Sequence, residues 1–190
     1  RQPFYPRSPY GVAKLYAYWI TVNYRESYGM YAYNGVLFNH ESPRRGSNFV
    51  TNKVVKGAVE ISKGLKQNLE LGNLDSSRDW GHSKDYVRAM HMIVNHETPD
   101  EWIVSTGTTH TVRDLCSYVF NSLGMNYEDY VVIDPRFYRP AEVEILVADP
   151  SKAREKLGWQ PKLTAKELCF EMMENDIKFA KQRAIMDEAD

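Results

Sequence analysis

The chain has 190 residues, of which 43% are hydrophobic and 26% charged, and its formal net charge is −1 at pH 7. This length and apolar content suffice for a hydrophobic core. The charge gives no reason to expect a nucleic-acid or membrane surface, and no apolar run approaches the roughly 18 residues of a membrane-spanning helix. No secretory signal peptide is visible, so the sequence predicts a cytoplasmic protein that binds neither nucleic acid nor membrane.

The first predicted element is a helix from Tyr10 to about Tyr28. Ser8 can serve as its N-cap, and Pro9 fits the first helical position because that residue needs no backbone N–H group. Gly29 follows the last helical residue, as is common at helix ends. The local signals therefore define both ends of this helix.

The opening turn of this helix carries a phenol and an ammonium four residues apart. At this spacing Tyr10 and Lys14 lie on the same helix face. A protonated Lys14 favours the phenolate form of Tyr10, which can take a proton from a sugar or alcohol hydroxyl while a hydride leaves the same carbon for a nicotinamide. Such pairs also arise by chance on ordinary helix surfaces, so the spacing alone leaves both interpretations open.

A strand is predicted from Tyr31 to Phe38, because this compact aromatic and aliphatic run has the length of a strand. Asn39, His40 and Glu41 stand at its C-terminal end. Open α/β sheets bind their ligands at that end of their strands. This strand end is therefore a place where a ligand is expected to bind.

The loop predicted from Asn39 to Lys53 is rich in basic residues. Arg44, Arg45 and Lys53 bring two guanidinium groups and an ammonium close to a helix N-terminus. All of these features favour an anion such as the diphosphate of a sugar nucleotide. Taken alone, the residues favour a solvated basic loop over an anion site.

The remaining segments alternate between helix and strand. They are a helix from Asn48 to about Lys63 stopped by Gly64, a short strand from Leu69 to Leu71, a helix from Lys84 to Asn95, a strand from Trp102 to Val104, a helix from Thr111 to Leu123 closed by Gly124, and a helix from Thr164 to about Arg183. Thr111 and Asp114 have the spacing of a capping box. The alternation predicts an α/β fold with a largely parallel sheet.

Three further groups of residues have side chains that could bind a phosphate or a metal ion or form a disulfide. In the turn-rich stretch from residue 73 to 82, Arg78 is a candidate phosphate ligand, or else the partner of Asp75 or Asp79 in a salt bridge. The five histidines show no metal-ligand spacing, so no metal site is predicted. Cys116 and Cys169 fall within apolar helical patterns and are expected in the core as free thiols.

Several longer motifs carry a specific resemblance. The stretch SPYGVAKLYAYW is followed by NYRESYGMYAYNGVLFNHESPRRGSNFVT, and the later motifs are RDWGHSKDYV, RPAEVE and DPSKAREKLGWQP. The Tyr-x-x-x-Lys pair alone would indicate only the extended short-chain dehydrogenase/reductase superfamily. Together the motifs cover nearly the whole chain, and they resemble the GDP-mannose 4,6-dehydratase family within that superfamily.

The resemblance implies the C-terminal portion of a Rossmann-type parallel sheet, interleaved with a smaller α/β substrate-binding domain. Residues 1–42 and about 66–105 would belong to the Rossmann domain, and about 43–65 and 106–190 to the sugar-nucleotide domain. The chain has no glycine-rich phosphate loop between a strand and a helix. The N-terminal Rossmann half is thus expected outside this chain, together with the family's catalytic threonine and glutamate. The isolated chain is expected to be inactive and poorly soluble.

Carried over residue by residue, the resemblance implies that Tyr10 and Lys14 are catalytic and also contact the cofactor, NADP. It places His40 and Arg45 beside that cofactor. The residues that it implies for binding GDP-mannose are Asn39, Lys53, Arg78, Arg139 and Glu142, with Arg139 on the diphosphate and Glu142 on the ribose hydroxyls. A carboxylate can accept two hydrogen bonds from a vicinal diol, so the last assignment makes chemical sense.

The reaction that the resemblance implies is the dehydration of GDP-mannose to GDP-4-keto-6-deoxymannose, on the route to GDP-fucose or other GDP-deoxyhexoses. Tyr10 takes the proton of the mannose 4-hydroxyl while a hydride passes from C4 to NADP. Lys14 holds the cofactor ribose and keeps Tyr10 ionised. The glutamate outside this chain removes the C5 proton and helps the C6 hydroxyl to leave as water, after which the hydride returns to C6. The enzyme would be a hydro-lyase with no net consumption of cofactor.

Two alternatives stay open. A nucleotide-sugar epimerase or reductase would use the same Tyr10 and Lys14, and a non-catalytic sugar-nucleotide-binding or oligomerisation fragment would need neither. In the resembling superfamily the helix that bears the catalytic pair commonly packs against a second subunit. By that analogy a homo-oligomer, either a dimer or a tetramer, is expected.

Overall fold

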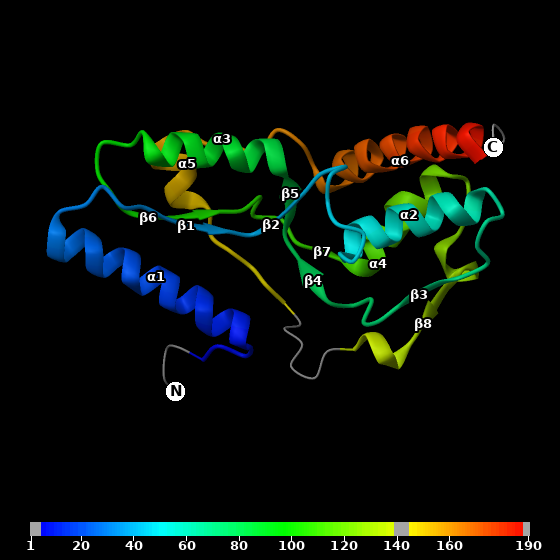
Figure 1. The fold of residues 1–190 in the computed structure, drawn as a ribbon, viewed down its shortest axis with the longest axis horizontal. Coiled ribbons are helices and arrows are strands. Elements are labelled where there is room, and N and C mark those ends of the chain that lie inside the picture. Colours follow the sequence, from blue (N-terminus) through cyan, green and yellow to red (C-terminus); the bar gives the residue numbers. More distant parts are fainter. Residues whose placement is uncertain (1–4, 139–144, 188–190) are drawn as a thin grey trace.

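The computed structural model describes residues 5–138 and 145–187 and combines helices with short strands, most of them paired in parallel (Figure 1). Its α-helices are α1 (Pro9–Tyr28), α2 (Val50–Ser62), α3 (Ser83–Val94), α4 (Val112–Ser122), α5 (Ser151–Leu157) and α6 (Ala165–Asp187). Its strands are β1 (Asn34–Leu37), β2 (Asn39–Glu41), β3 (Leu69–Leu71), β4 (Ser77–Arg78), β5 (Trp80–His82), β6 (Glu101–Val104), β7 (His110–Thr111) and β8 (Val131–Ile133). Two 3-10 turns, η1 (Tyr127–Asp129) and η2 (Pro135–Phe137), flank β8.

The strands pair in twos. β1 pairs with β6, β2 with β5 and β3 with β8, all in parallel, while β4 and β7 are antiparallel. In each parallel pair the two strands are far apart in sequence, and helices occupy the chain between them. The expected α/β fold with largely parallel strands is confirmed.

Helix α1 has the ends that the sequence predicts. The Ser8 hydroxyl accepts a hydrogen bond of 3.0 Å from the Gly11 N–H group, and Pro9 occupies the first helical position. Gly29 adopts a left-handed conformation with φ 64°, which a glycine adopts without a steric penalty. Only Val22 of this helix is buried. Near its C-terminus Arg25 forms an ion pair with Glu101 of β6, which attaches the helix to the β1–β6 pair.

The predicted strand from Tyr31 to Phe38 is shorter in the structure, and the prediction of a loop beginning at Asn39 is wrong. β1 ends at Leu37, and the Phe38 N–H group still donates to the Val104 carbonyl at 3.0 Å. The chain then changes partner from β6 to β5, and residues 39–41 form β2. The cause is long-range pairing, which the local sequence does not reveal.

The turn-rich stretch from residue 73 to 82 also contains two strands that were not predicted, β4 and β5. The helix predicted from Thr111 is confirmed as α4, and both bonds of its capping box with Asp114 are present. The segment after Pro150 forms the short helix α5, for which no element was predicted.

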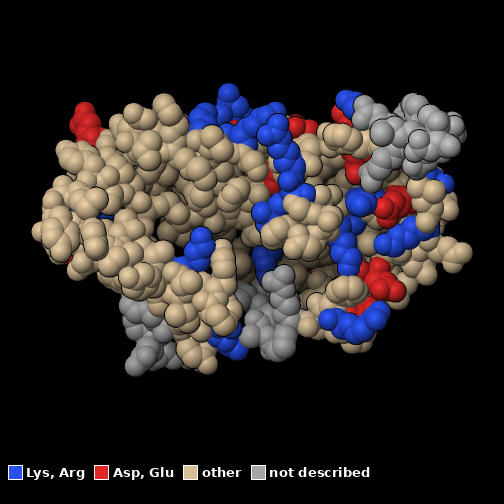
Figure 2. All heavy atoms as spheres, in the orientation of Figure 1, with Lys and Arg blue, Asp and Glu red and all other residues tan. Residues whose placement is uncertain are grey.

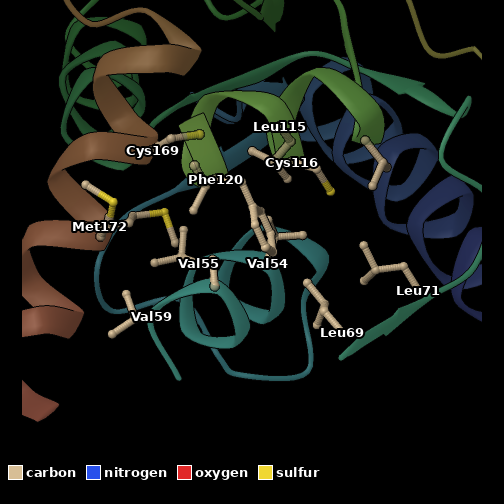
Figure 3. Packing of buried hydrophobic residues seen from close by; sticks show 14 of the residues in the cluster. Val54, Val55, Val59, Leu69, Leu71, Leu115, Cys116, Phe120, Cys169 and Met172 are labelled. Carbon is tan, nitrogen blue, oxygen red and sulfur yellow. The ribbon is translucent and has the colours of Figure 1, made fainter. Parts of the chain in front are cut away.

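The buried apolar residues form two clusters. The larger one joins α2, α4 and α6 with β3, and its side chains point toward one another from these four elements (Figure 3). Cys116 and Cys169 lie in it as free, buried thiols, as predicted, and burial raises the pKa of each to about 12. The second cluster joins α3 and β6 with the segment from residue 153 to 159. No helix in the described part of the chain is long and apolar enough to cross a membrane.

Candidate functional site

The predicted catalytic pair lies in the first two turns of α1. The ammonium of Lys14 stands 5.5 Å from the centroid of the Tyr10 ring, so the two side chains share one helix face. The Tyr10 side chain is open to solvent, with 71% of the residue exposed. The phenol is therefore accessible from solution, and a cation lies beside its ring.

A second group of side chains lies where β2 ends and α2 begins. Glu41, the last residue of β2, is only 2% exposed. Its Oε2 atom accepts a hydrogen bond of 2.8 Å from the Thr51 hydroxyl and lies 2.9 Å from Nε of Arg45. Burial raises the pKa of Glu41, against the opposing effects of the Thr51 hydrogen bond and the Arg45 charge. A buried carboxylate therefore holds one of the predicted cofactor ligands.

His40 lies beside this group, in the middle of β2. Its Nδ1 atom is 2.9 Å from the Phe38 carbonyl, and its ring stacks on Tyr86 of α3 with 4.9 Å between the centroids. Tyr86 is fully buried, and burial raises the pKa of its phenol. The stack fixes the imidazole plane one residue before the carboxyl end of β2.

The neighbouring strand β5 ends in a buried histidine. Nδ1 of His82 accepts a 3.0 Å hydrogen bond from the Lys84 N–H group, and its Nε2 atom lies 2.9 Å from the Glu171 carboxylate of α6. This histidine thus caps α3 and connects β5 to α6. In parallel register it stands directly across from Glu41.

Lys53 lies in the first turns of α2 and faces a 3-10 turn. Its ammonium stands 3.5 Å from the centroid of the Phe137 ring in η2, and burial lowers the pKa of Lys53. A Cβ atom at Gly72 would come within 2.7 Å of the Phe137 carbonyl oxygen, so the absence of a side chain there lets η2 pack this closely. The ammonium therefore lies in a cation–π contact rather than in open solvent.

Arg78 lies in β4, where it is paired with His110 of β7, and its guanidinium donates to the Ser77 carbonyl at 2.8 Å. Asp75 is paired with Arg113, and Asp79 accepts hydrogen bonds from Thr106 and Gly107. The predicted residues Arg139 and Glu142 lie outside the described residues.

The structure brings the predicted residues together in separate groups. Tyr10 contacts Lys14, and Asn39, His40 and Arg45 gather along β2 and the turn that follows it. Among residues 5–138 and 145–187, no interaction is found that joins these two groups directly. A cavity of about 330 Å³ lies next to the second group and is lined by Pro43, Asn52, Met172, Asn175, Asp176 and Phe179. No cluster of His, Cys, Asp or Glu able to hold a metal ion is found within those same described ranges.

Three residues of this region were given no role by the sequence. Glu41 stands within a predicted binding segment, but its contact with Arg45 depends on the turn between them. Thr51 and Tyr86 reach the site from two helices through tertiary packing. The only local signal is the spacing of four residues between Glu41 and Arg45. Outside a helix this spacing does not determine whether two side chains meet.

Comparison with known proteins gives these groups a context. A family model described as GDP-mannose 4,6 dehydratase matches residues 1–172. A GDP-mannose 4,6-dehydratase of Vibrio cholerae is 49% identical over 211 residues, which cover 97% of this chain and 57% of that protein. GDP-mannose 4,6 dehydratase 1 of Arabidopsis thaliana is 49% identical over 187 residues, covering 98% of this chain and 52% of that protein. The chain therefore spans about half the length of these curated relatives.

Solved structures share the fold at lower identity. RMD of Pseudomonas aeruginosa, complexed with NADPH, has a TM-score of 0.82 and 22% identity, covering 92% of this chain and 57% of that one. A UDP-glucose 4-epimerase of Thermotoga maritima, with UDP-glucose, has a TM-score of 0.78 and 26% identity, covering 93% and 55%. The match to the family model and the relatives of nearly half identity agree with the motifs, and the chain belongs to the GDP-mannose 4,6-dehydratase family.

Proposed function

We propose that this chain forms part of a GDP-mannose 4,6-dehydratase that converts GDP-mannose to GDP-4-keto-6-deoxymannose with NADP as cofactor. The observation that carries the proposal is the contact between Lys14 and Tyr10, in the opening turns of a capped helix. Family membership supports the choice of substrate. Because the chain spans about half of its relatives, the reaction is proposed for a complete protein.

The residues of the chain fit a nicotinamide dinucleotide in their chemistry. Such a cofactor carries phosphates and ribose hydroxyls, and the ammonium of Lys14, the imidazole of His40 and the guanidinium of Arg45 are suitable donors for them. His40 and Arg45 also lie at the carboxyl end of parallel strands, where α/β sheets bind dinucleotides. The chemistry that NADP supplies when bound is the reversible transfer of a hydride.

In the proposed mechanism Tyr10 acts as the base. Its phenolate removes the proton from the 4-hydroxyl of mannose, and Lys14 stabilises that phenolate and donates to the cofactor ribose. Asn39, Lys53 and Arg78 bind the sugar nucleotide, and Arg139 and Glu142 complete its site. Lys53 would have to exchange its contact with the Phe137 ring for a substrate oxygen, so η2 would adjust when GDP-mannose binds.

The arrangement of domains and subunits is part of the proposal. The Rossmann part comprises residues 1–42 and about 66–105, and the sugar-nucleotide part about 43–65 and 106–190. The described residues form two separate apolar clusters, and each draws on both ranges: Leu69 and Trp80 belong to the larger cluster, and Trp159 to the other. A homo-oligomer and a cytoplasmic location likewise remain predictions.

The test uses a hybrid protein in which this chain is joined to the part of the Vibrio cholerae relative that lies outside the matched region. Incubated with GDP-mannose and NADP, the hybrid should yield a 4-keto-6-deoxy sugar nucleotide, identified by mass spectrometry and NMR. An epimerised or reduced sugar would instead support a nucleotide-sugar epimerase or reductase. Binding of GDP-mannose without any product would support a non-catalytic role.

The role of Tyr10 is tested in the same hybrid. Tyr10→Phe should lower turnover about 10²- to 10⁴-fold, because the variant lacks the general base. Affinity for GDP-mannose, measured by calorimetry, should change little. Tyr16→Phe is the matched control, since Tyr16 is exposed on the same helix. Turnover of Tyr10→Phe equal to that of Tyr16→Phe would rule out Tyr10 as the base.

A further inference from the structure

The position of Arg45 depends on a buried carboxylate. Glu41 is one of the most buried charged residues in the described part of the chain, at 2% exposed. An ionised carboxylate removed from water is costly unless it is paired and hydrogen-bonded. Its Oε2 atom has both kinds of partner, the hydroxyl of Thr51 at 2.8 Å and Nε of Arg45 at 2.9 Å.

The carboxylate itself is held by rigid elements. Glu41 is the last residue of β2, where it stands in parallel register with His82 of β5, and its carbonyl accepts a 3.0 Å hydrogen bond from Ser83. Thr51 lies in the first turn of α2 and is also buried. The position of Oε2 is thus set by a strand pair on one side and a helix on the other.

Arg45, by contrast, lies in the turn between β2 and α2, and three contacts fix it. Nε meets Glu41, the guanidinium carbon lies 3.4 Å from the centroid of the Phe49 ring, and the backbone carbonyl accepts from the Asn52 amide. Contacts with Nε and with one face of the guanidinium plane determine its orientation. The Arg45 side chain keeps 26% of its surface exposed, so part of it stays open to a ligand, and its Nη groups are further hydrogen-bond donors.

We propose that Glu41 is the positioning residue for Arg45, and that it holds the guanidinium at the carboxyl end of β2 to donate to a bound nicotinamide dinucleotide. The inference rests on the proposed function, because it takes the dinucleotide as the ligand of Arg45. Glu41 touches neither cofactor nor substrate in this role. Its effect on binding passes entirely through the arginine.

The experiment measures the Kd for NADP by titration calorimetry in the hybrid protein. Glu41→Gln removes the charge that orients Arg45 and should raise this Kd roughly tenfold or more, by analogy with the partners that orient metal ligands. Glu41→Asp keeps the charge on a shorter side chain and should give a smaller increase. The KM for GDP-mannose should stay within about twofold of the parent value in both variants. Glu60→Gln, a half-buried glutamate on α2, is the control.

A double variant separates positioning from a general loss of structure. In an Arg45→Ala background, Glu41→Gln should add nothing to the Kd for NADP, since the arginine that it positions is gone. An equal increase in both backgrounds would overturn the inference. So would an unchanged Kd in Glu41→Asp, which also serves as the test should Glu41→Gln fail to fold, as judged by circular dichroism.

The outcomes also distinguish this inference from the proposed function. If Arg45→Ala leaves the Kd for NADP unchanged, Arg45 is not a cofactor ligand, and that part of the proposed function fails together with the inference. If Arg45→Ala raises the Kd and Glu41→Gln does not, the cofactor site stands and the positioning role alone is overturned.

Discussion

Gly81, in the middle of β5, lies against the ring of Tyr86, which in turn stacks on His40. A Cβ atom at this position would overlap the Tyr86 ring and come within 3.0 Å of the Thr106 methyl group. Because the ring is fully buried, it has little room to move. Gly81→Ala in the hybrid should therefore lower the free energy of unfolding by about 1–3 kcal/mol, as measured by urea denaturation.

The matched control is Gly35→Ala in β1. A Cβ atom there has Leu37 as its nearest neighbour at 3.5 Å, which is an ordinary contact. The two glycines both lie in strands with ordinary backbone conformations, so the comparison isolates the packing against Tyr86. Equal unfolding free energies for the two variants would contradict the account of Gly81.

At the scale of single residues, the sequence predicted side chains that act through local spacing. Tyr10 and Lys14 meet because a helix brings residues four apart together. Their contact was predictable because Ser8 and Pro9 mark the start of that helix. The contacts of Glu41 and Tyr86 escaped prediction, because the partner of Glu41 lies in a turn and the partner of Tyr86 lies in a strand that is distant in sequence. The sequence thus predicts which residues can do chemistry better than it predicts which residues hold them in place.

At the scale of elements, the start of α6 offers a test by pH. The Glu167 carboxylate accepts hydrogen bonds from the backbone N–H group of Thr164 at 2.8 Å and from its hydroxyl at 2.7 Å, and these bonds hold the pKa of Glu167 below its usual value. A carboxylate with a lowered pKa stabilises the folded state above its ordinary pKa of roughly 4.3. That stabilisation is lost as the pH falls through the lowered pKa.

Glu167→Gln in the hybrid should accordingly lower the urea midpoint at pH 7, and the difference from the parent should shrink toward zero as the pH approaches 3. Glu155→Gln, at an exposed position on α5, should show no such trend. A difference between Glu167→Gln and the parent that is constant from pH 7 to pH 3 would show that the carboxylate charge has no part in capping α6.

The helices were predicted more accurately than the strands for a physical reason. Helices α1 and α4 carry their own caps and stop residues within a few positions of their ends. Strands β4, β5 and β7 have two or three residues each, too few for a period-two pattern, and they exist because a distant segment pairs with them. β2 was missed in the same way, because the chain leaves its pairing with β6 at Phe38 and pairs with β5 from Asn39 onward.

At the scale of the whole molecule, α1 presents a large apolar surface. Tyr16, Trp19, Tyr24 and Tyr28 are all exposed along it. The face shown in Figure 2 carries few charged side chains over this helix, while Lys and Arg gather nearer the middle of the molecule. Exposed apolar area of this extent on one element is typical of a protein interface.

We therefore expect the hybrid protein to self-associate through α1. Tyr16→Asp and Tyr24→Asp each place a charge on this surface and should shift the protein toward smaller species in sedimentation velocity experiments. Leu65→Asp, at an exposed apolar position in the loop after α2, should leave the distribution unchanged. A hybrid that is monomeric at all concentrations, or variants that sediment like the parent, would contradict a role for α1 in assembly.

The two apolar clusters give the molecule separate optical reporters. Of its four tryptophans, Trp80 is buried in the larger cluster, while Trp102 and Trp159 are buried in the other, and Trp19 is exposed on α1. Indole emission shifts to longer wavelength when water reaches the ring. Replacing all but one of these residues with phenylalanine would therefore let a fluorimeter follow each cluster by itself, and would reveal whether the two lose their packing in one cooperative step or in succession.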